Sequence, residues 1–427
     1  MFYGYSSYTE FNQILKLVIL VITAFFLDVY FIRGIKALIS KKNRRLIYKL
    51  VIRTNWIVFF LFLSFVLGYF IIRNTDCDNP VRPLYIIWVN TVFILVYFPK
   101  ILFNVLQLLQ DILRLIQFTL EKLLRKKVIS NVLFKNIFLK TGALLSVFVF
   151  LIIFQGIFWG KYNFKIKQVI LEFQNLPTAF DGYKVVQFSD IHFGSFSEYA
   201  PFEEAIKLIN NLHPDLLLFT GDMVNFKATE AEPWINLFNG LESVDGKFAV
   251  LGNHDFGDYV ACYNEIQRGE EVSRLLRIQQ KMGFENLQNE SVNIHKGNDS
   301  LALLGVMNWS NPPYKSYGNL EKAYHGNSEA LFKILLSHDP HHWEQEVRDN
   351  YLIDLTLSGH THGAQFGIDL PFYRWCPIKW KYKYWGGLYS EKGKFLYVNT
   401  GLGLIGFHGR IGMRPEITEI ILRKKIY

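Results

Sequence analysis

Two histidines lie two positions apart in the segment LTLSGHTHGAQFG, residues 355–367. His360 and His362 follow a short apolar run and are flanked by Gly359 and Gly363. Imidazole is the commonest metal ligand among side chains, and glycine lets the backbone approach a ligand closely. A histidine pair at a strand end does little for a sheet but can hold a metal ion. The segment therefore predicts part of a metal site.

Four further segments end in side chains that can bind a metal or move a proton. Each is a short apolar run, typical of a buried strand, that stops at carboxylate, amide or imidazole groups. The candidate residues are Asp190, His192, Asp222, Asn253, His254, Asp255 and His338. In open α/β sheets, ligand sites gather at the carboxyl ends of strands. We therefore expect one convergent site, with helices over 201–212 and 266–282 between the strands.

The donor types indicate which ions such a site would hold. Carboxylates, imidazoles and an amide, without a thiolate, suit Mn, Fe or Zn, and we favour Mn. Two ions about 3.5–4 Å apart need a carboxylate between them. The predicted cofactor is a pair of divalent metal ions.

The order of these blocks, D-x-H, G-D, G-N-H-D, a lone H and G-H-x-H, resembles that of the calcineurin-like metallophosphoesterase superfamily. The similarity extends from about residue 176 to residue 421. Segments such as LPTAFDGYKVVQFSDIHFG and GHTHGAQFGIDLP resemble the membrane-associated branch with YkuE-type and animal transmembrane phosphoesterases. This chain departs from that branch at Ala364, where glycine is most common. The resemblance implies an α/β fold, a two-sheet sandwich flanked by helices.

The resemblance also implies a role for each candidate residue. Asp190, His192 and His362 resemble the ligands of one metal, Asn253, His338 and His360 those of the second, and Asp222 the bridging carboxylate. His254 resembles the histidine that faces the phosphate as general acid or charge stabiliser. Asp255 is expected to orient His254.

The implied reaction is hydrolysis of a phosphate ester by a metal-activated hydroxide, with the two cations clamping the phosphoryl oxygens. Both monoesters and diesters are compatible with His254. Ser195 and Ser358 lack the strand–turn–helix context of a nucleophilic serine, and we expect them to support the backbone.

Three further histidines lie near these motifs. His341 and His342 follow Pro340 and are expected to begin an exposed helix. His408, in GFHGRIGMRPEI, either reaches the site or lies outside it, and the sequence leaves both alternatives open.

An aromatic–basic segment, YRWCPIKWKYKYWGGLY, covers residues 373–389. Interleaved aromatic and basic side chains can hold a lipid headgroup layer, form plain surface structure, or bind nucleic acid. We favour the membrane interpretation and expect no nucleic acid, since the first 160 residues predict a membrane domain.

That domain is predicted from four apolar stretches, about 14–32, 56–72, 84–106 and 141–160. A helix needs on the order of 20 apolar residues to cross the hydrocarbon layer. The third stretch contains Pro99 and Lys100, and we expect Lys100 to reach toward the membrane surface. We therefore predict two domains, a transmembrane domain over 1–160 and a phosphoesterase domain over 161–427.

The net charge of +9 fits this arrangement, because the loops around 33–53 and 114–140 are rich in lysine and arginine. By the positive-inside rule these loops are cytoplasmic. The sequence thus predicts an integral protein of the plasma (inner) membrane with an extracytoplasmic catalytic domain.

The predicted function is a membrane-anchored phosphoesterase, and proximity to the bilayer suggests a phospholipid or lipid-linked phosphate as substrate. A soluble nucleotide or another small phosphate ester is the alternative. A non-catalytic binding module, or a transporter with a regulatory soluble domain, are rivals from other classes. The expected spans show almost no buried charge and no internal repeat, which disfavours a transporter.

Overall fold

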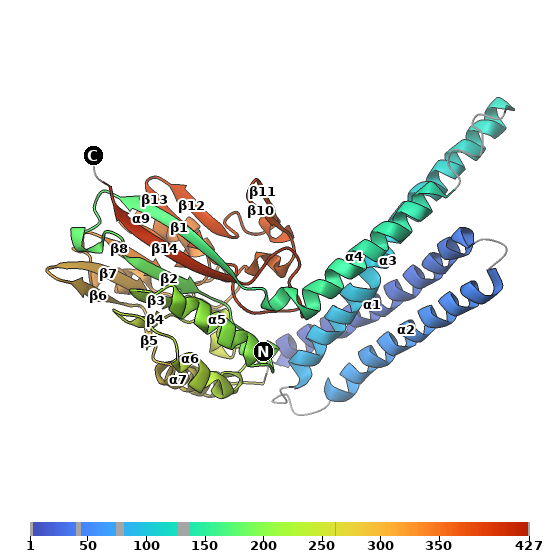
Figure 1. Ribbon diagram of the computed structural model, residues 1–427. Coiled ribbons are helices and arrows are strands. Elements are labelled where there is room, and N and C mark those ends of the chain that lie inside the picture. The colour runs from blue at the N-terminus through green and yellow to red at the C-terminus, as the bar shows by residue number, and fades with distance from the viewer. Residues whose placement is uncertain (1–2, 40–43, 74–80, 127–135, 261, 426–427) are drawn as a thin grey trace. The chain divides into compact units, whose positions relative to one another are not determined.

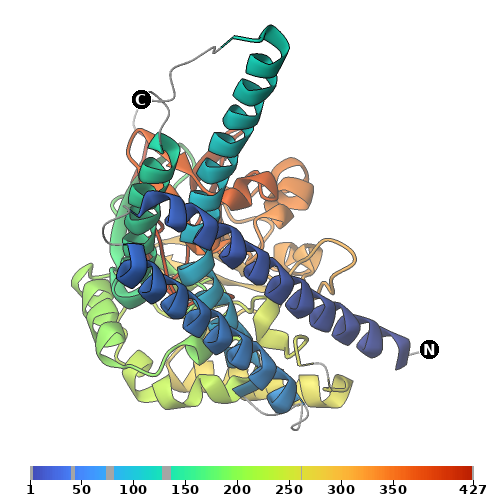
Figure 2. The ribbon, with the colours of Figure 1, turned by 90° about the vertical axis from the view of Figure 1, so that its right-hand side faces the viewer.

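The computed structural model describes residues 3–39, 44–73, 81–126, 136–260 and 262–425 (Figures 1 and 2). The chain forms two compact units, Met1–Gln155 and Gly156–Tyr427.

The first unit consists of long apolar helices, α1 (Tyr3–Leu38), α2 (Arg44–Arg73), α3 (Val81–Leu124) and α4 (Ile137–Phe158). Each contains a stretch long and apolar enough to cross a membrane: Leu15–Leu38, Leu46–Gly68, Tyr85–Leu124 and Ile137–Phe158. The third helix continues through Pro99 without ending, so its apolar stretch is longer than the sequence predicts. Only 11–28% of the residues in the most apolar part of each stretch are buried within the protein, as expected of helices whose side chains face lipid.

A charged contact inside this unit corrects two expectations from the sequence. Lys100 Nζ lies 2.5 Å from Asp28 Oδ1 and 2.9 Å from Asn55 Oδ1, and Tyr97 donates to Asp28 Oδ2 at 3.1 Å. The Asp28 side chain is fully buried and that of Lys100 is 12% exposed. Lys100 is therefore turned into the bundle instead of reaching for the membrane surface, and the spans do carry buried charge. An ionised group in the hydrocarbon layer needs such a partner, because its desolvation is costly.

The second unit is built from two six-stranded sheets. Sheet A has the order β1 (Lys165–Phe173), β14 (Glu416–Lys424), β2 (Lys184–Phe188), β3 (Leu216–Phe219), β4 (Lys247–Ala249) and β5 (Glu285–Asn286). Sheet B has the order β12 (Gly387–Glu391), β13 (Lys394–Val398), β9 (Leu355–Ser358), β8 (Lys333–Leu336), β7 (Asp299–Gly305) and β6 (Glu290–Lys296). A small hairpin pairs β10 (Ile368–Leu370) with β11 (Tyr373–Trp375).

Helices pack against the outer faces of the two sheets, and Figure 1 shows α5, α6 and α7 along one side of the strands. The outer face of sheet A packs against α5 (Ala200–Asn211), α6 (Ile235–Asn239) and α7 (Glu265–Lys281). That of sheet B packs against α8 (Leu320–His325) and the helical turns around α9 (Arg348–Asn350). The two longest helices of this unit, α5 and α7, confirm those predicted from the sequence.

The sheets share an apolar core. It includes Val185, Leu216 and Leu218 of sheet A together with Leu336 and Leu357 of sheet B, all fully buried. Because β2, β3 and β4 are parallel, as are β8 and β9, their carboxyl ends share an edge of each sheet. The predicted two-sheet sandwich flanked by helices is confirmed, and this edge is where the candidate residues lie.

Candidate metal centre

Each predicted metal ligand follows the carboxyl end of a strand. Five of the seven adopt a left-handed backbone conformation: Asp190 (φ 51°), His192 (52°), Asp222 (58°), His360 (71°) and His362 (51°). Residues other than glycine rarely adopt positive φ, and such conformations cluster at functional sites. The turned backbone directs these side chains inward, so that residues far apart in the sequence meet.

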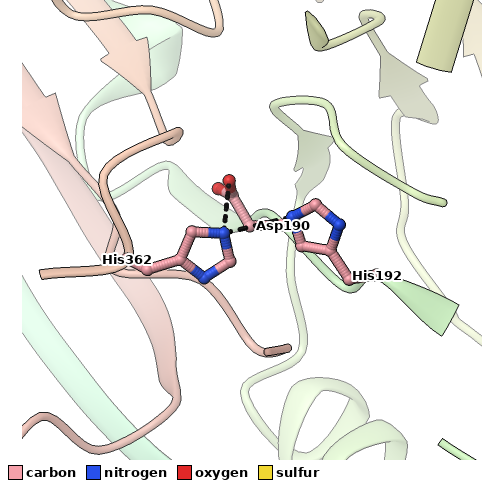
Figure 3. Close-up of side chains that lie close together, drawn as sticks. All are labelled: Asp190, His192 and His362. Atoms are coloured by element: carbon pink, nitrogen blue, oxygen red, sulfur yellow. Dashed lines mark hydrogen bonds and ion pairs between the residues drawn. The ribbon is translucent and has the colours of Figure 1, made fainter. Parts of the chain in front are cut away.

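The first group of side chains consists of Asp190, His192 and His362 (Figure 3). His362 Nε2 lies 3.3 Å from Asp190 Oδ1 and 3.1 Å from His192 Nε2. All three residues are buried. Three donor atoms that converge in this way can share one metal ion.

The second group consists of Asp222, His338 and His360, and Asn253 adjoins it. His360 Nδ1 lies 2.8 Å from Asn253 Oδ1 and 3.3 Å from His338 Nε2. The donor atoms face one another as in the first group.

One carboxylate oxygen lies between the groups. Asp222 Oδ2 is 3.6 Å from His192 Nε2 in the first group and 3.2 Å from His338 Nε2 in the second. A carboxylate in this position can contact ions in both groups.

Glycines allow the loops to approach this closely. A Cβ on Gly359 would overlap the Ser189 hydroxyl and the Asp190 carboxylate, and one on Gly252 would overlap the Asp222 carboxylate. Both positions therefore exclude a side chain.

Backbone carbonyls fix the histidine rings. His192 Nδ1 donates to the Val224 carbonyl at 3.1 Å, and His338 Nδ1 donates to the Thr220 carbonyl at 2.7 Å. In each ring this leaves Nε2 as the nitrogen that faces the site, where a metal ion would bind.

The electrostatics follow from burial and from the close packing of charges. Burial lowers the pKa of His192, His254 and His360, so these rings are neutral near pH 7. Burial alone would raise the pKa of Asp222 and lower that of His338, but their mutual attraction is stronger. The pKa of Asp222 lies well below its usual value and that of His338 rises to about 10. A cation bound at His338 would have to displace this proton.

The structure gives Asp255 a different contact from the one expected. Its carboxylate accepts N–H groups of Asp222, Met223 and Gly252 at 2.8–2.9 Å. The ring of His254 is oriented instead by the Asn225 carbonyl, which accepts from Nδ1 at 2.8 Å. Asp255 thus joins the loop that carries Asp222 to the loop that carries Asn253. The sequence suggested a contact with His254 because the two residues are adjacent, but the Asp255 carboxylate binds backbone N–H groups instead.

Several contacts to the site could not be read from the sequence. Tyr382, in the aromatic–basic segment, places its hydroxyl 2.6 Å from His360 Nε2. Tyr259 stacks on His254, with ring centroids 4.3 Å apart, and its hydroxyl accepts from Asn253 Nδ2 at 2.7 Å. Arg410 is buried, with Nη2 3.4 Å from His362 Nδ1. The sequence pointed to Tyr382 through the alternation of aromatic residues with lysine in residues 373–389, but that pattern was interpreted as a membrane-facing surface and not as part of the metal site.

The remaining candidates lie around this centre. His341 stacks on Tyr382 at 4.2 Å between ring centroids, and is thus one layer removed from the ligands. His342 is buried, unlike the exposed residue expected, with Nδ1 2.8 Å from Ser337 Oγ. Within GFHGRIGMRPEI, Arg410 is the residue with a described contact to a predicted ligand. Ser195 donates to the Leu404 carbonyl at 2.7 Å, which is a supporting contact.

The donor set fits divalent metal ions. It comprises imidazole nitrogens and carboxylate oxygens in two buried or half-buried groups, each with its atoms within 4.8 Å of one another, and the adjoining amide oxygen of Asn253. Such donors suit first-row divalent ions.

Comparison with known proteins agrees with this chemistry. Residues 183–364, which contain every predicted site residue, match the family model of the calcineurin-like phosphoesterases. Residues 13–161 match a model described as the transmembrane domain of probable calcineurin-like phosphoesterases.

Individual relatives cover mainly the second unit. An uncharacterized metallophosphoesterase of Bacillus subtilis, YkuE, is 34% identical over 257 residues, which are 58% of this chain and 82% of that protein. A zebrafish transmembrane protein with a metallophosphoesterase domain is 27% identical over 61% of this chain, and the match spans 57% of that protein. The UDP-2,3-diacylglucosamine pyrophosphatase LpxG of Chlamydia trachomatis is 28% identical over 54% of this chain and 81% of that protein. The chain therefore belongs to the calcineurin-like phosphoesterase family and is a metal-dependent phosphoric ester hydrolase with a transmembrane domain.

Proposed function

We propose that this enzyme uses two divalent cations to hydrolyse a phosphate ester of a membrane lipid or a lipid-linked compound. Asp190, His192 and His362 would hold one cation, and Asn253, His338 and His360 the other. The position of Asp222 Oδ2 between the two groups is the observation that carries this proposal. Mn is the ion we favour.

Bound cations would supply Lewis-acid stabilisation of the phosphoryl oxygens and lower the pKa of water. The protein's own part is positioning. The buried loops fix the ligand atoms before substrate arrives, so that little reorganisation accompanies the reaction.

His254 is proposed to exchange a proton with the substrate or to stabilise its charge. Its Nδ1 is held by the Asn225 carbonyl, and its backbone N–H donates to Asp222 Oδ1 at 2.8 Å. The remaining nitrogen, Nε2, is left for a phosphate oxygen or a leaving group. The nearby Asp222 favours the protonated ring, in opposition to burial, which lowers the pKa of His254.

Two observations support a lipid substrate. The transmembrane domain keeps the catalytic unit at a bilayer. The name of the relative LpxG describes a diacylated glucosamine derivative as its substrate. A small soluble phosphate ester such as a nucleotide is the alternative.

Replacing the shared carboxylate tests the two-cation proposal. Purified Asp222→Asn protein, supplied with Mn, should release no phosphate from a lipid extract or from an aryl phosphate, because the variant removes the negative charge between the cations. The exposed carboxylate of Asp349 supplies a control, since Asp349→Asn should keep full activity. Undiminished phosphate release by the Asp222 variant would rule out the two-cation mechanism.

The substrate class is tested on the same preparations. Lipid phosphates in mixed micelles should be hydrolysed with a higher kcat/KM than a soluble aryl phosphate or nucleotide. A preference for the soluble esters would favour the alternative.

We also propose that the catalytic unit lies outside the cytoplasm in the plasma membrane, because four spans follow the positive-inside rule with both basic loops inside. A protease added to intact cells should then cleave a tag fused after residue 427. If the tag were protected until the cells are opened, the catalytic unit would lie in the cytoplasm and the proposed orientation would be wrong.

A further inference from the structure

The β10–β11 hairpin has an apolar and a polar face. In its register Leu370 pairs with Tyr373, and Ile368 pairs with Trp375. Because successive side chains of a strand point to opposite faces, these four lie on one face. The intervening pair, Asp369 with Arg374, lies on the other face.

The polar face attaches the hairpin to the rest of the unit. Asp369 contacts Arg374 Nε at 2.6 Å, Lys167 Nζ at 3.2 Å and Lys165 Nζ at 3.5 Å. Arg374 Nη1 donates to the Gly386 carbonyl at 2.9 Å. The ion pairs thus face the protein, and the apolar side is left outward.

The outward side is unusually apolar for a surface. We define the hairpin face as Ile368, Leu370, Phe372, Tyr373 and Trp380, whose exposures are 41, 45, 85, 52 and 75%. Trp380 adjoins the hairpin because its ring centroid lies 5.9 Å from that of Trp375. A contiguous exposed apolar patch of this kind marks an interaction site.

The residues around the hairpin face match a lipid headgroup layer. Lys379, Lys381 and Lys383 are exposed beside Trp380. Aromatic side chains favour the membrane interface, and each lysine near an anionic bilayer contributes about 1 kcal/mol of attraction.

Chain connectivity brings the hairpin within reach of a bilayer. Lys165, which contacts Asp369, follows shortly after Phe158, the last residue of a candidate span. The seven-residue step between them extends at most about 25 Å. We propose that the hairpin face docks on an anionic bilayer surface, with its aromatic side chains among the headgroups. This inference depends on the transmembrane domain and not on which ester is hydrolysed.

Photocrosslinking of the full chain in nanodiscs tests this docking. The photoreactive residue p-benzoylphenylalanine would be placed at position 372 or 380, in discs of phosphatidylcholine with and without phosphatidylglycerol. Lipid adducts should form at both positions, and their yield should rise several-fold with phosphatidylglycerol. In a Lys379→Gln, Lys381→Gln background that rise should shrink.

Positions 244 and 331 are matched controls. Val244 and Leu331 are 77% and 74% exposed and precede β4 and β8, at the opposite ends of the strands from the metal ligands. Equal lipid adduct yields at all four positions would overturn the proposal, as would adducts from 372 and 380 to a second copy of the chain. Crosslinking needs no turnover, so its outcome is separate from that of the phosphate-release assays.

Discussion

The imidazole of His360 is held from both sides. Its Nδ1 faces Asn253 and His338, and its Nε2 faces the Tyr382 hydroxyl at 2.6 Å. Burial raises the pKa of Tyr382, so the phenol stays neutral and its oxygen can accept a hydrogen bond from His360 Nε2–H. This contact keeps the Nδ1 lone pair directed at the metal position.

Removing this hydroxyl should weaken metal binding. Tyr382→Phe keeps the ring that stacks on His341 but loses the acceptor for His360, and loss of such outer partners typically costs about 10- to 100-fold in metal affinity. Metal titration by calorimetry measures the effect. Tyr384→Phe is the control, because the Tyr384 hydroxyl contacts Glu391. Equal affinity in the two variants would contradict the role of Tyr382.

Gly359 is needed for a different reason, because the space beside its Cα is filled by other side chains. Gly359→Ala would place a Cβ on the Ser189 hydroxyl and the Asp190 carboxylate, so a ligand of the first group must move. We expect lost metal content by elemental analysis and lost phosphate release. Gly269→Ala lies in α7, where the new Cβ would meet no atom within 4 Å apart from the backbone of its own helix, so this change should leave both unchanged and stabilise the helix by about 0.5–1 kcal/mol. If the Gly359→Ala variant still bound its full complement of metal, the loop would be able to shift enough to accommodate the added methyl group.

For individual residues, the sequence revealed which side chains are candidate ligands but not which neighbouring groups orient them. His360 and His362 are recognisable because two imidazoles follow an apolar run, and the structure brings them to the other candidates. The metal assignments stay predictions. Asn225 could not be found, because it acts through a carbonyl that any residue possesses.

Among the elements, the described part of the transmembrane helices contains a buried ion pair between Lys100 and Asp28. Breaking it by Lys100→Met leaves the Asp28 carboxylate without its cation in the bundle, which should lower the free energy of unfolding by about 3–5 kcal/mol. Thermal unfolding in detergent measures this loss. The Lys100→Met, Asp28→Leu double variant should recover much of it.

The exposed Lys49 provides the comparison on α2. Lys49→Met should unfold like the unmodified protein, and an equally small effect of Lys100→Met would mean that the ion pair contributes nothing. The presence and approximate positions of the four apolar helices were predictable from the sequence, since they depend on local composition, but α3 runs well past the predicted span, to Leu124. The pairing of Lys100 with Asp28 was not predictable, because it depends on how α1 and α3 pack.

For the molecule as a whole, both sheets supply ligands to the centre. Asp190 and Asp222 follow strands of sheet A, and His338 and His362 follow strands of sheet B. Cations bound only by the folded state stabilise it by about 2.7 kcal/mol at one hundred times Kd.

Chelation should therefore destabilise the catalytic unit. We expect treatment with a chelator to lower its melting temperature by about 5–10 °C, measured by scanning calorimetry with and without Mn. The Asp222→Asn variant should show a smaller shift on chelation. The same shift in both proteins would place the stabilising ion elsewhere.

The order of strands has a consequence for how the enzyme is made. β14, which follows every other described strand in the sequence, lies between β1 and β2, and β2 leads directly to Asp190 and His192. A chain emerging from the ribosome or from an export channel cannot complete sheet A until residues 416–424 are released. We therefore expect ion binding to follow the release of residues 416–424, so that the compartment in which the second unit folds would supply the metal.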